Sequence, residues 1–152
     1  MQLKGIIHRC SLLVLALLVG VSLSGCVTYT LNNMAKAKKG IDKYYLTIEQ
    51  QRYDDALNFY SPRYFESSSI DTLRAMLDNV KTIAGQHEDH QLVQWRAAFS
   101  NKNDSAIQLL YRVTYSHGQT LESLLVSPKG KIHGHEIRFI DEFGNEMKLM
   151  EI

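Results

Sequence analysis

Two histidines stand two positions apart late in the chain, in the segment His133-Gly134-His135. Side chains at i and i+2 of a β-strand lie on one face, so these imidazoles would be close enough to share a metal ion. Glu136 would face the other way. No spacing fixes a third ligand, for which the candidates are His87, His90 and His117. We therefore assign no metal or cofactor, and keep His133 and His135 as candidate metal or pocket residues.

Phenols and carboxylates offer a second kind of chemistry. An isomerase-like site needs a carboxylate in an apolar pocket beside a phenol that donates to a developing oxyanion. The chain supplies the phenols Tyr44, Tyr45, Tyr53, Tyr60, Tyr64, Tyr111 and Tyr115 and the carboxylates Asp54, Asp55, Glu122 and Glu136. No motif pairs them, and tyrosines on apolar stripes are commonly core residues. No Gly-rich phosphate loop or Ser-His-Asp order is present either, so no catalytic residue is assigned.

A third reactive group is the thiol of Cys26, which ends the segment Leu23-Ser24-Gly25-Cys26. An apolar run from Ser11 to Leu23 precedes it, and the only charges before that run are Lys4 and Arg9. A positive start, an apolar middle and small residues before a cut are the parts of a secretory signal. The run is shorter than the roughly 20 residues that a membrane span needs, so a permanent span is the weaker interpretation. Residues 1–25 are therefore predicted to be a signal peptide.

Leu23-Ser24-Gly25-Cys26 resembles the lipobox of bacterial lipoproteins. The resemblance implies that Cys26 becomes the first residue after cleavage and carries a thioether-linked diacylglycerol and usually an amide-linked acyl chain, such as palmitate. Two or more chains are enough for stable anchoring. The next residue is Val27, not the aspartate that favours inner-membrane retention in the enterobacterial sorting pattern of this family. The resemblance thus implies the periplasmic face of the outer membrane, with the inner membrane as the alternative.

Composition limits what the mature chain does. The whole chain has 17 Lys plus Arg against 16 Asp plus Glu, and removing Lys4 and Arg9 leaves 15 against 16. This balance does not favour binding to nucleic acid. The short basic stretch of Lys36, Lys38 and Lys39 is either a solvated helix face or a lipid-headgroup contact. Because Cys10 lies in the signal, the mature domain has no thiol for a disulfide or a nucleophile.

The elements that must position these groups are helices first and strands afterwards. After a tether at residues 26–31, a single domain is predicted for residues 32–152. Helical spacing predicts helices at residues 32–51, at 52–60 and from a Ser69 cap to Gly85, the last with Leu73, Met76, Leu77, Val80 and Ile83 on its buried stripe. Alternation predicts strands at residues 93–99, 107–115, 120–126 and 131–140, the first with Val93, Trp95, Ala97 and Phe99 on one face. Residues 141–150 would be an edge strand or a frayed end.

Short loops between these strands predict an antiparallel meander, and hence an α+β fold with N-terminal helices packed on a curved, cone-like sheet of about four strands. The segment from Tyr53 to Pro62, together with this order of elements, resembles the nuclear transport factor two-like (cystatin-like) fold. Members of that fold bind small molecules, catalyse isomerase or dehydratase reactions, or assemble with partners.

Fold alone does not choose among these activities. The function favoured by the residues is non-catalytic: a lipid-anchored envelope protein that binds a protein partner or a small apolar ligand. Trp95 and the tyrosines would line a ligand pocket or fill the core. The alternative is an isomerase-like enzyme that uses the cone pocket.

Overall fold

The computed structural model describes residues 31–99, 105–141 and 143–146. The predicted signal peptide, Cys26 and the tail beyond residue 146 lie outside the described residues. Contacts divide the chain into residues 1–32 and 33–152, and the fold below is that of the second unit. Within the described ranges, no helix is long and apolar enough to cross a membrane.

The first described helix covers residues 31–49 and presents one apolar stripe to the core. Its buried positions follow the three-and-four spacing of the sequence and are Ala37, Ile41, Tyr44, Tyr45 and Ile48. Such a stripe is what an amphipathic helix buries against a sheet. The predicted helix is therefore confirmed, with its end two residues earlier because Gln51 has a φ of +57°.

The second predicted helix, residues 52–60, has nearly the predicted extent but is not α-helical throughout. The structure has a single turn, α2 (Tyr53–Ala56), followed by the 3₁₀ helix η1 (Leu57–Phe59). Tyr60 is already extended and pairs with Ile132 in a parallel bridge. A further 3₁₀ turn, η2 (Tyr64–Glu66), follows Pro62. Pairing with the sheet thus ends the helix before the proline does.

The third helix, α3 (Ile70–Ala84), has the predicted ends. The Ser69 hydroxyl accepts a hydrogen bond from the Thr72 N–H at 3.0 Å, and Gly85 terminates the helix with a φ of +90°. Its buried residues are Leu73, Leu77, Val80 and Ala84. Ile83, predicted on that stripe, is 42% exposed, and Ala84 takes the buried position.

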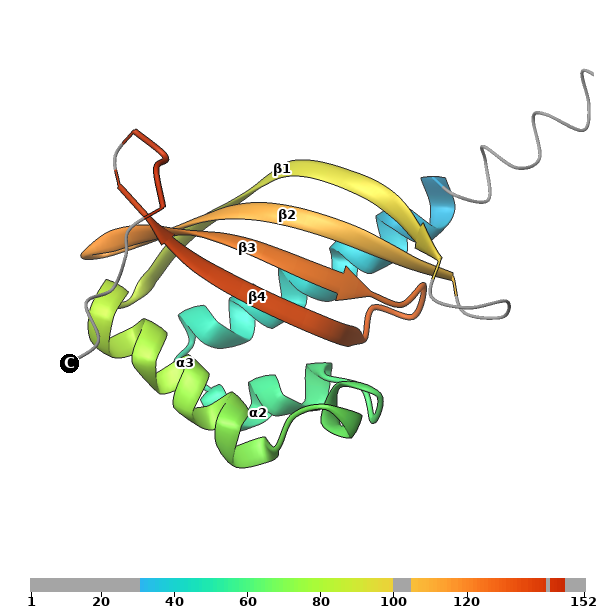
Figure 1. Cartoon of the computed structure of the whole chain (residues 1–152), viewed down its shortest axis with the longest axis horizontal. Helices are drawn as coiled ribbons and strands as arrows, with labels where there is room; N and C mark the ends of the chain where they lie inside the picture. The colour runs from blue at the N-terminus through green and yellow to red at the C-terminus, as the bar shows by residue number, and fades with distance from the viewer. Residues whose placement is uncertain (1–30, 100–104, 142, 147–152) are drawn as a thin grey trace, which may run out of the picture. The chain divides into compact units, whose positions relative to one another are not determined.

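Four antiparallel strands form one sheet in the order β1-β2-β3-β4, namely β1 (His87–Phe99), β2 (Ser105–Tyr115), β3 (Gly118–Val126) and β4 (Ile132–Ile140). The sheet is curved, and the helix 31–49, coloured blue to cyan, crosses one of its faces (Figure 1). Buried side chains of this helix, of α3 and of β2 to β4 form one hydrophobic cluster. The predicted α+β architecture is confirmed.

The first strand departs from simple alternation. A register shift lies between Leu92, which is opposite Tyr111, and Gln94, which is opposite Leu110. The extra residue, Val93, is 52% exposed, although the sequence pattern placed it with Trp95 on the apolar face. A β-bulge changes which face the later side chains occupy, and period-two reasoning does not detect it. Asp141 and Asn145 are joined by a backbone hydrogen bond of 2.9 Å, and Glu146 forms a bridge back to Ile140.

Candidate functional site

A carboxylate lies at the centre of the core. Glu122 is on β3, 1% exposed, at the same strand parity as the buried Thr120, Leu124 and Val126. Its Oε1 accepts hydrogen bonds from the hydroxyls of Tyr115 and Thr120, both at 2.8 Å. Its Oε2 accepts from the Tyr45 hydroxyl at 2.9 Å. A buried carboxylate is tolerated only when such donors replace its hydration.

The fourth partner of the carboxylate is an imidazole from the next strand. His135 Nε2 lies 3.0 Å from Glu122 Oε2, and the two side chains are 0% and 1% exposed. Two carboxylate oxygens offer about four acceptor positions. The four donors therefore saturate Glu122, and no acceptor position remains for a ligand.

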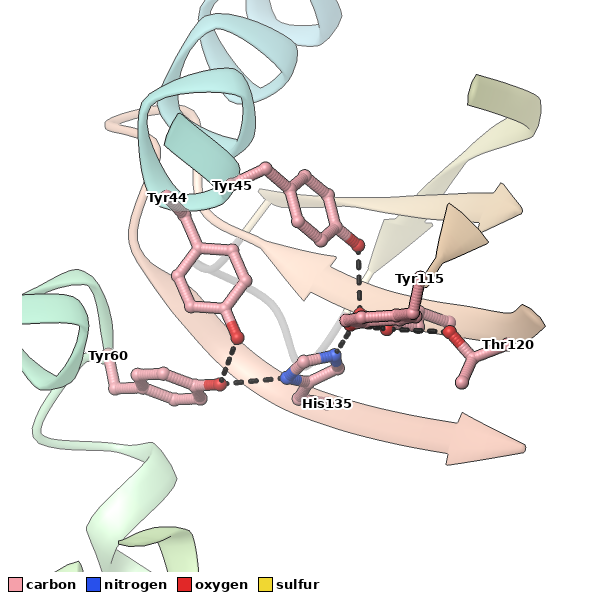
Figure 2. Close-up of polar contacts among 7 residues, drawn as sticks. Tyr44, Tyr45, Tyr60, Tyr115, Thr120 and His135 are labelled. Atoms are coloured by element: carbon pink, nitrogen blue, oxygen red, sulfur yellow. Dashed lines mark hydrogen bonds and ion pairs between the residues drawn. The ribbon is translucent and has the colours of Figure 1, made fainter. Parts of the chain in front are cut away.

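A chain of hydrogen bonds continues from the far side of the imidazole. His135 Nδ1 lies 2.7 Å from the Tyr60 hydroxyl, which donates to the Tyr44 hydroxyl at 3.3 Å. The chain thus links Glu122, through His135, to two tyrosine hydroxyls. Figure 2 shows this chain, with Tyr44 and Tyr45 coming from one helix and His135 from the sheet.

The electrostatics follow from this arrangement. Burial acts to raise the pKa of Glu122, but the hydrogen bond and charge of His135, with the hydroxyls of Thr120 and Tyr115, outweigh it and hold the pKa below its ordinary value. Burial and then the Glu122 charge raise the pKa of Tyr45 and of Tyr115. The carboxylate stays ionised and the phenols stay protonated at neutral pH. This is the charge distribution of a closed structural network.

A second polar cluster lies on the other side of Tyr45. The rings of His87 and His90 stack on Tyr45 at centroid distances of 5.5 and 4.4 Å. Within the described residues, both nitrogens of His87, Nδ1 of His90 and the hydroxyl of Tyr111 are buried without a hydrogen-bond partner. Burial and then the charge of His90 lower the pKa of His87. These imidazoles are packed as aromatic rings.

The space beside the Glu122 network is small. A cavity of about 10 Å³ is lined by residues of the helix 31–49, α3 and the sheet, among them Tyr44, Leu77, Tyr115 and Ile137. That volume is close to the minimum that one water molecule needs. The core side chains of the described chain therefore fill the interior where a ligand would have to enter.

In the structure, the two histidines that the sequence offered as metal ligands form hydrogen bonds with different partners. His133 and His135 both turn their Nδ1 atoms to the segment after η1, where the partners are Ser61 Oγ at 2.7 Å and the Tyr60 hydroxyl. His133 lies in the register shift between β3 and β4. In the described ranges, no group of three or more His, Cys, Asp or Glu side chains is arranged to hold a metal ion.

Of the phenols and carboxylates named from the sequence, the fold joins several phenols to one carboxylate, directly or through His135, and leaves other carboxylates on the surface. Tyr45 and Tyr115 meet Glu122, whereas Asp54 is on the surface in an ion pair with Arg74, and Glu136 pairs with Arg138 on the other sheet face. One feature of the sequence could have indicated this site: Glu122 stands two and four positions before Leu124 and Val126, and so lies on the same face of the strand as these apolar residues. A charged residue at such a position requires buried partners.

Hollows open on the surface of the described chain, and three of them differ in size and lining. One, of about 900 Å³, lies between α2 and the start of α3, and a second, of about 500 Å³, lies between the helix 31–49 and the β3–β4 turn. The third, of about 200 Å³, lies over β1 to β4 and contains Trp95 among polar side chains. Comparison with protein-family models, curated proteins and solved structures finds no match for this chain.

Proposed function

We propose that this protein is a lipid-anchored, periplasm-facing envelope protein of the outer membrane, with a nuclear transport factor two-like domain that binds a protein partner through its surface. The observation that carries the proposal is the filled interior. Glu122 already accepts four hydrogen bonds, and the adjacent cavity holds about 10 Å³. A small apolar ligand would have to displace core tyrosines, so binding falls to the surface.

The same observation weighs against isomerase or dehydratase chemistry. A general base needs access to its substrate and a pKa near the working pH. The pKa of Glu122 is lowered, and its oxygens face protein donors on every side. Lipid attachment at Cys26, supported by the lipobox and the short apolar run before it, would keep such a module close to envelope partners.

The surface best suited to a protein partner is the hollow between α2 and α3, which we call the apolar groove. Its apolar lining is Leu57, Tyr60, Pro62, Phe65 and Ile70, and its polar lining includes Asp54 and Arg74. These two charged side chains pair at 3.2 Å, and Ile70 is 48% exposed. An apolar centre beside a polar rim is the usual anatomy of a protein interface. The occupant we propose is an apolar segment of a membrane-associated protein.

The test is site-specific photocrosslinking in intact envelopes. A photoreactive phenylalanine analogue replaces Ile70 in the groove, and in a control it replaces Val93, which is on β1 and 52% exposed. We expect one discrete adduct from the Ile70 position, none from Val93, and loss of the adduct in a Cys26→Ser background. Equal labelling at both positions, or no adduct at either, would contradict the proposal.

The anchor has its own test. Cys26→Ser should abolish incorporation of labelled palmitate and release the protein from membranes, since Cys26 is the only thiol after the signal. The control is Cys10→Ser, which removes a thiol from the predicted signal and should leave labelling of the mature protein intact. Unchanged labelling of Cys26→Ser would refute lipidation.

A further inference from the structure

Five exposed lysines surround one open hollow. Three come from the helix 31–49 and two from the turn between β3 and β4. We call this surface the lysine groove; its lysines are Lys36, Lys39, Lys43, Lys129 and Lys131. Phe59, at the end of η1, also lines it. The sequence shows only part of this cluster, because the two contributing segments are far apart in the chain.

Two glycines bring these segments together. A Cβ on Gly40 would lie 2.6 Å from Gly130 Cα, so the turn rests directly on the helix backbone. Gly130 also has a φ of +78°, a conformation that residues with a Cβ rarely adopt. Because neither contact residue has a side chain, the flanking lysines of both segments reach the same hollow.

The positive charge of the lysine groove is not neutralised by nearby carboxylates. Asp42, on the same helix as three of these lysines, pairs with Lys38 at 2.8 Å. Lys131 donates to the backbone carbonyl of Asn58. Within the described chain, none of the five groove lysines forms an ion pair. A chain that is nearly neutral overall therefore presents one concentrated basic surface.

We propose that the lysine groove binds the phosphate headgroups of anionic membrane lipids. Ammonium groups act as point charges that accept phosphate without fixed bidentate geometry. The hollow is broad and open, as a surface for several headgroups must be, and an aromatic ring among basic side chains suits a membrane interface. Each Lys near an anionic surface adds to the attraction.

The membrane is favoured over a soluble polyanion by the position of the predicted anchor, and in this respect the inference rests on the proposed function. Lys36 follows Cys26 by about ten residues, a length of chain that spans at most roughly 36 Å. A lipid on Cys26 would hold the helix 31–49 within reach of the headgroups. The groove would then orient the domain on the membrane.

The experiment reconstitutes the full lipidated chain in vesicles of pure phosphatidylcholine or of phosphatidylcholine with phosphatidylglycerol. Amine-reactive labelling read by mass spectrometry then reports each lysine. We expect labelling of the five groove lysines to fall about fivefold on the anionic vesicles, the factor that corresponds to about 1 kcal/mol per lysine, and to recover in high salt. Lys81, exposed on α3, should change little.

Two double variants distinguish the effect of where the charges lie from the effect of net charge. Lys39→Gln with Lys129→Gln removes two charges from the groove, and Lys38→Gln with Lys81→Gln removes two charges elsewhere. Only the first double variant should lose the protection of the remaining groove lysines against amine-reactive labelling on anionic vesicles. Equal effects of both pairs, or protection by inorganic phosphate with no preference for anionic vesicles, would overturn the inference.

Failure of the anchor is distinguishable from failure of the groove. Protein that stays on pure phosphatidylcholine but shows equal labelling on both vesicles contradicts the groove and leaves the anchor standing. Protein that leaves pure phosphatidylcholine contradicts the anchor. In that case, two unlipidated proteins test the groove: Cys26→Ser alone, and Cys26→Ser combined with Lys39→Gln and Lys129→Gln. Tighter binding of the first protein to anionic vesicles supports the groove, and equal binding contradicts it.

Discussion

His135 and Glu122 form a fully buried pair between neighbouring strands, with Nε2 3.0 Å from Oε2 and side-chain exposures of 0% and 1%. The pair connects the sheet with the helix 31–49 and with the segment after η1. Tyr45 reaches Glu122 from the helix 31–49, and Tyr60 reaches His135 from the segment after η1. Replacing such a group affects helix packing and the sheet together.

Glu122→Ala is expected to destabilise the domain by about 3–5 kcal/mol, because it leaves the buried imidazole and three hydroxyls without their acceptor. Urea denaturation measures the change. The control is Glu136→Ala on the other sheet face, where the side chain is 67% exposed and the loss should stay within about 0.5 kcal/mol. Similar losses for the two variants would contradict a structural role for the network.

Acid stability should depend on the same carboxylate. The folded-state pKa of Glu122 lies below its ordinary value of 4.5, so its stabilising contribution is complete above that pH and is lost as the pH falls from there through the folded-state value. Glu122→Gln removes this titration. Its unfolding free energy should therefore fall less than that of the wild type below pH 4.5. Parallel pH profiles of the two proteins would argue against the assignment.

His87 should affect the stability of the domain at higher pH than Glu122 does. Burial and the neighbouring His90 lower the pKa of His87, and Glu122, Glu49 and Asp89 only partly oppose them. The unfolded chain therefore takes up a proton more readily, and stability is lost as the pH falls below the ordinary value of 6.5. His87→Phe keeps an aromatic ring beside Tyr45 and should lose less stability from pH 6.5 downwards. Thermal unfolding at several pH values tests this, and a wild-type profile that is flat across this window would contradict it.

Gly40→Ala should destabilise the domain, although alanine is the better helix former by about 1 kcal/mol. The added Cβ would lie 2.6 Å from Gly130 Cα, and overpacking against backbone costs about 1–3 kcal/mol. Gly118→Ala is the control, since no atom lies within 4 Å of its added Cβ. Chemical denaturation compares the two variants. A stabilised Gly40→Ala protein would show that the helix and turn do not meet as described.

The cap of α3 offers a further check. Ser69→Ala removes the hydroxyl that accepts from the Thr72 N–H at 3.0 Å and should cost about 1 kcal/mol. Ser68→Ala, one residue earlier, should cost much less. Equal losses would mean that the hydroxyl of Ser69 does not stabilise this helix end.

Much of the architecture could be predicted because it depends on local periodicity. The stripe of the helix 31–49 and both ends of α3 follow from residue spacing and cap chemistry alone. The structure differs from the predictions where a contact with a distant segment changed the local backbone structure. The helix before Tyr60, which pairs with Ile132, tightens to a 3₁₀ turn, and the bulge in β1 exposes Val93. Neither partner is adjacent in sequence, so no local pattern reveals it.

The sequence by itself determined the order of elements, and it predicts an address that ends at Cys26. Only the tertiary structure decided which phenols meet that carboxylate, how His133 and His135 are engaged, and that Gly40 and Gly130 assemble five lysines around one hollow. The physical reason is that periodicity fixes the face on which a side chain lies. Its partner depends on register, bulges and close backbone approach between segments that are distant in the chain.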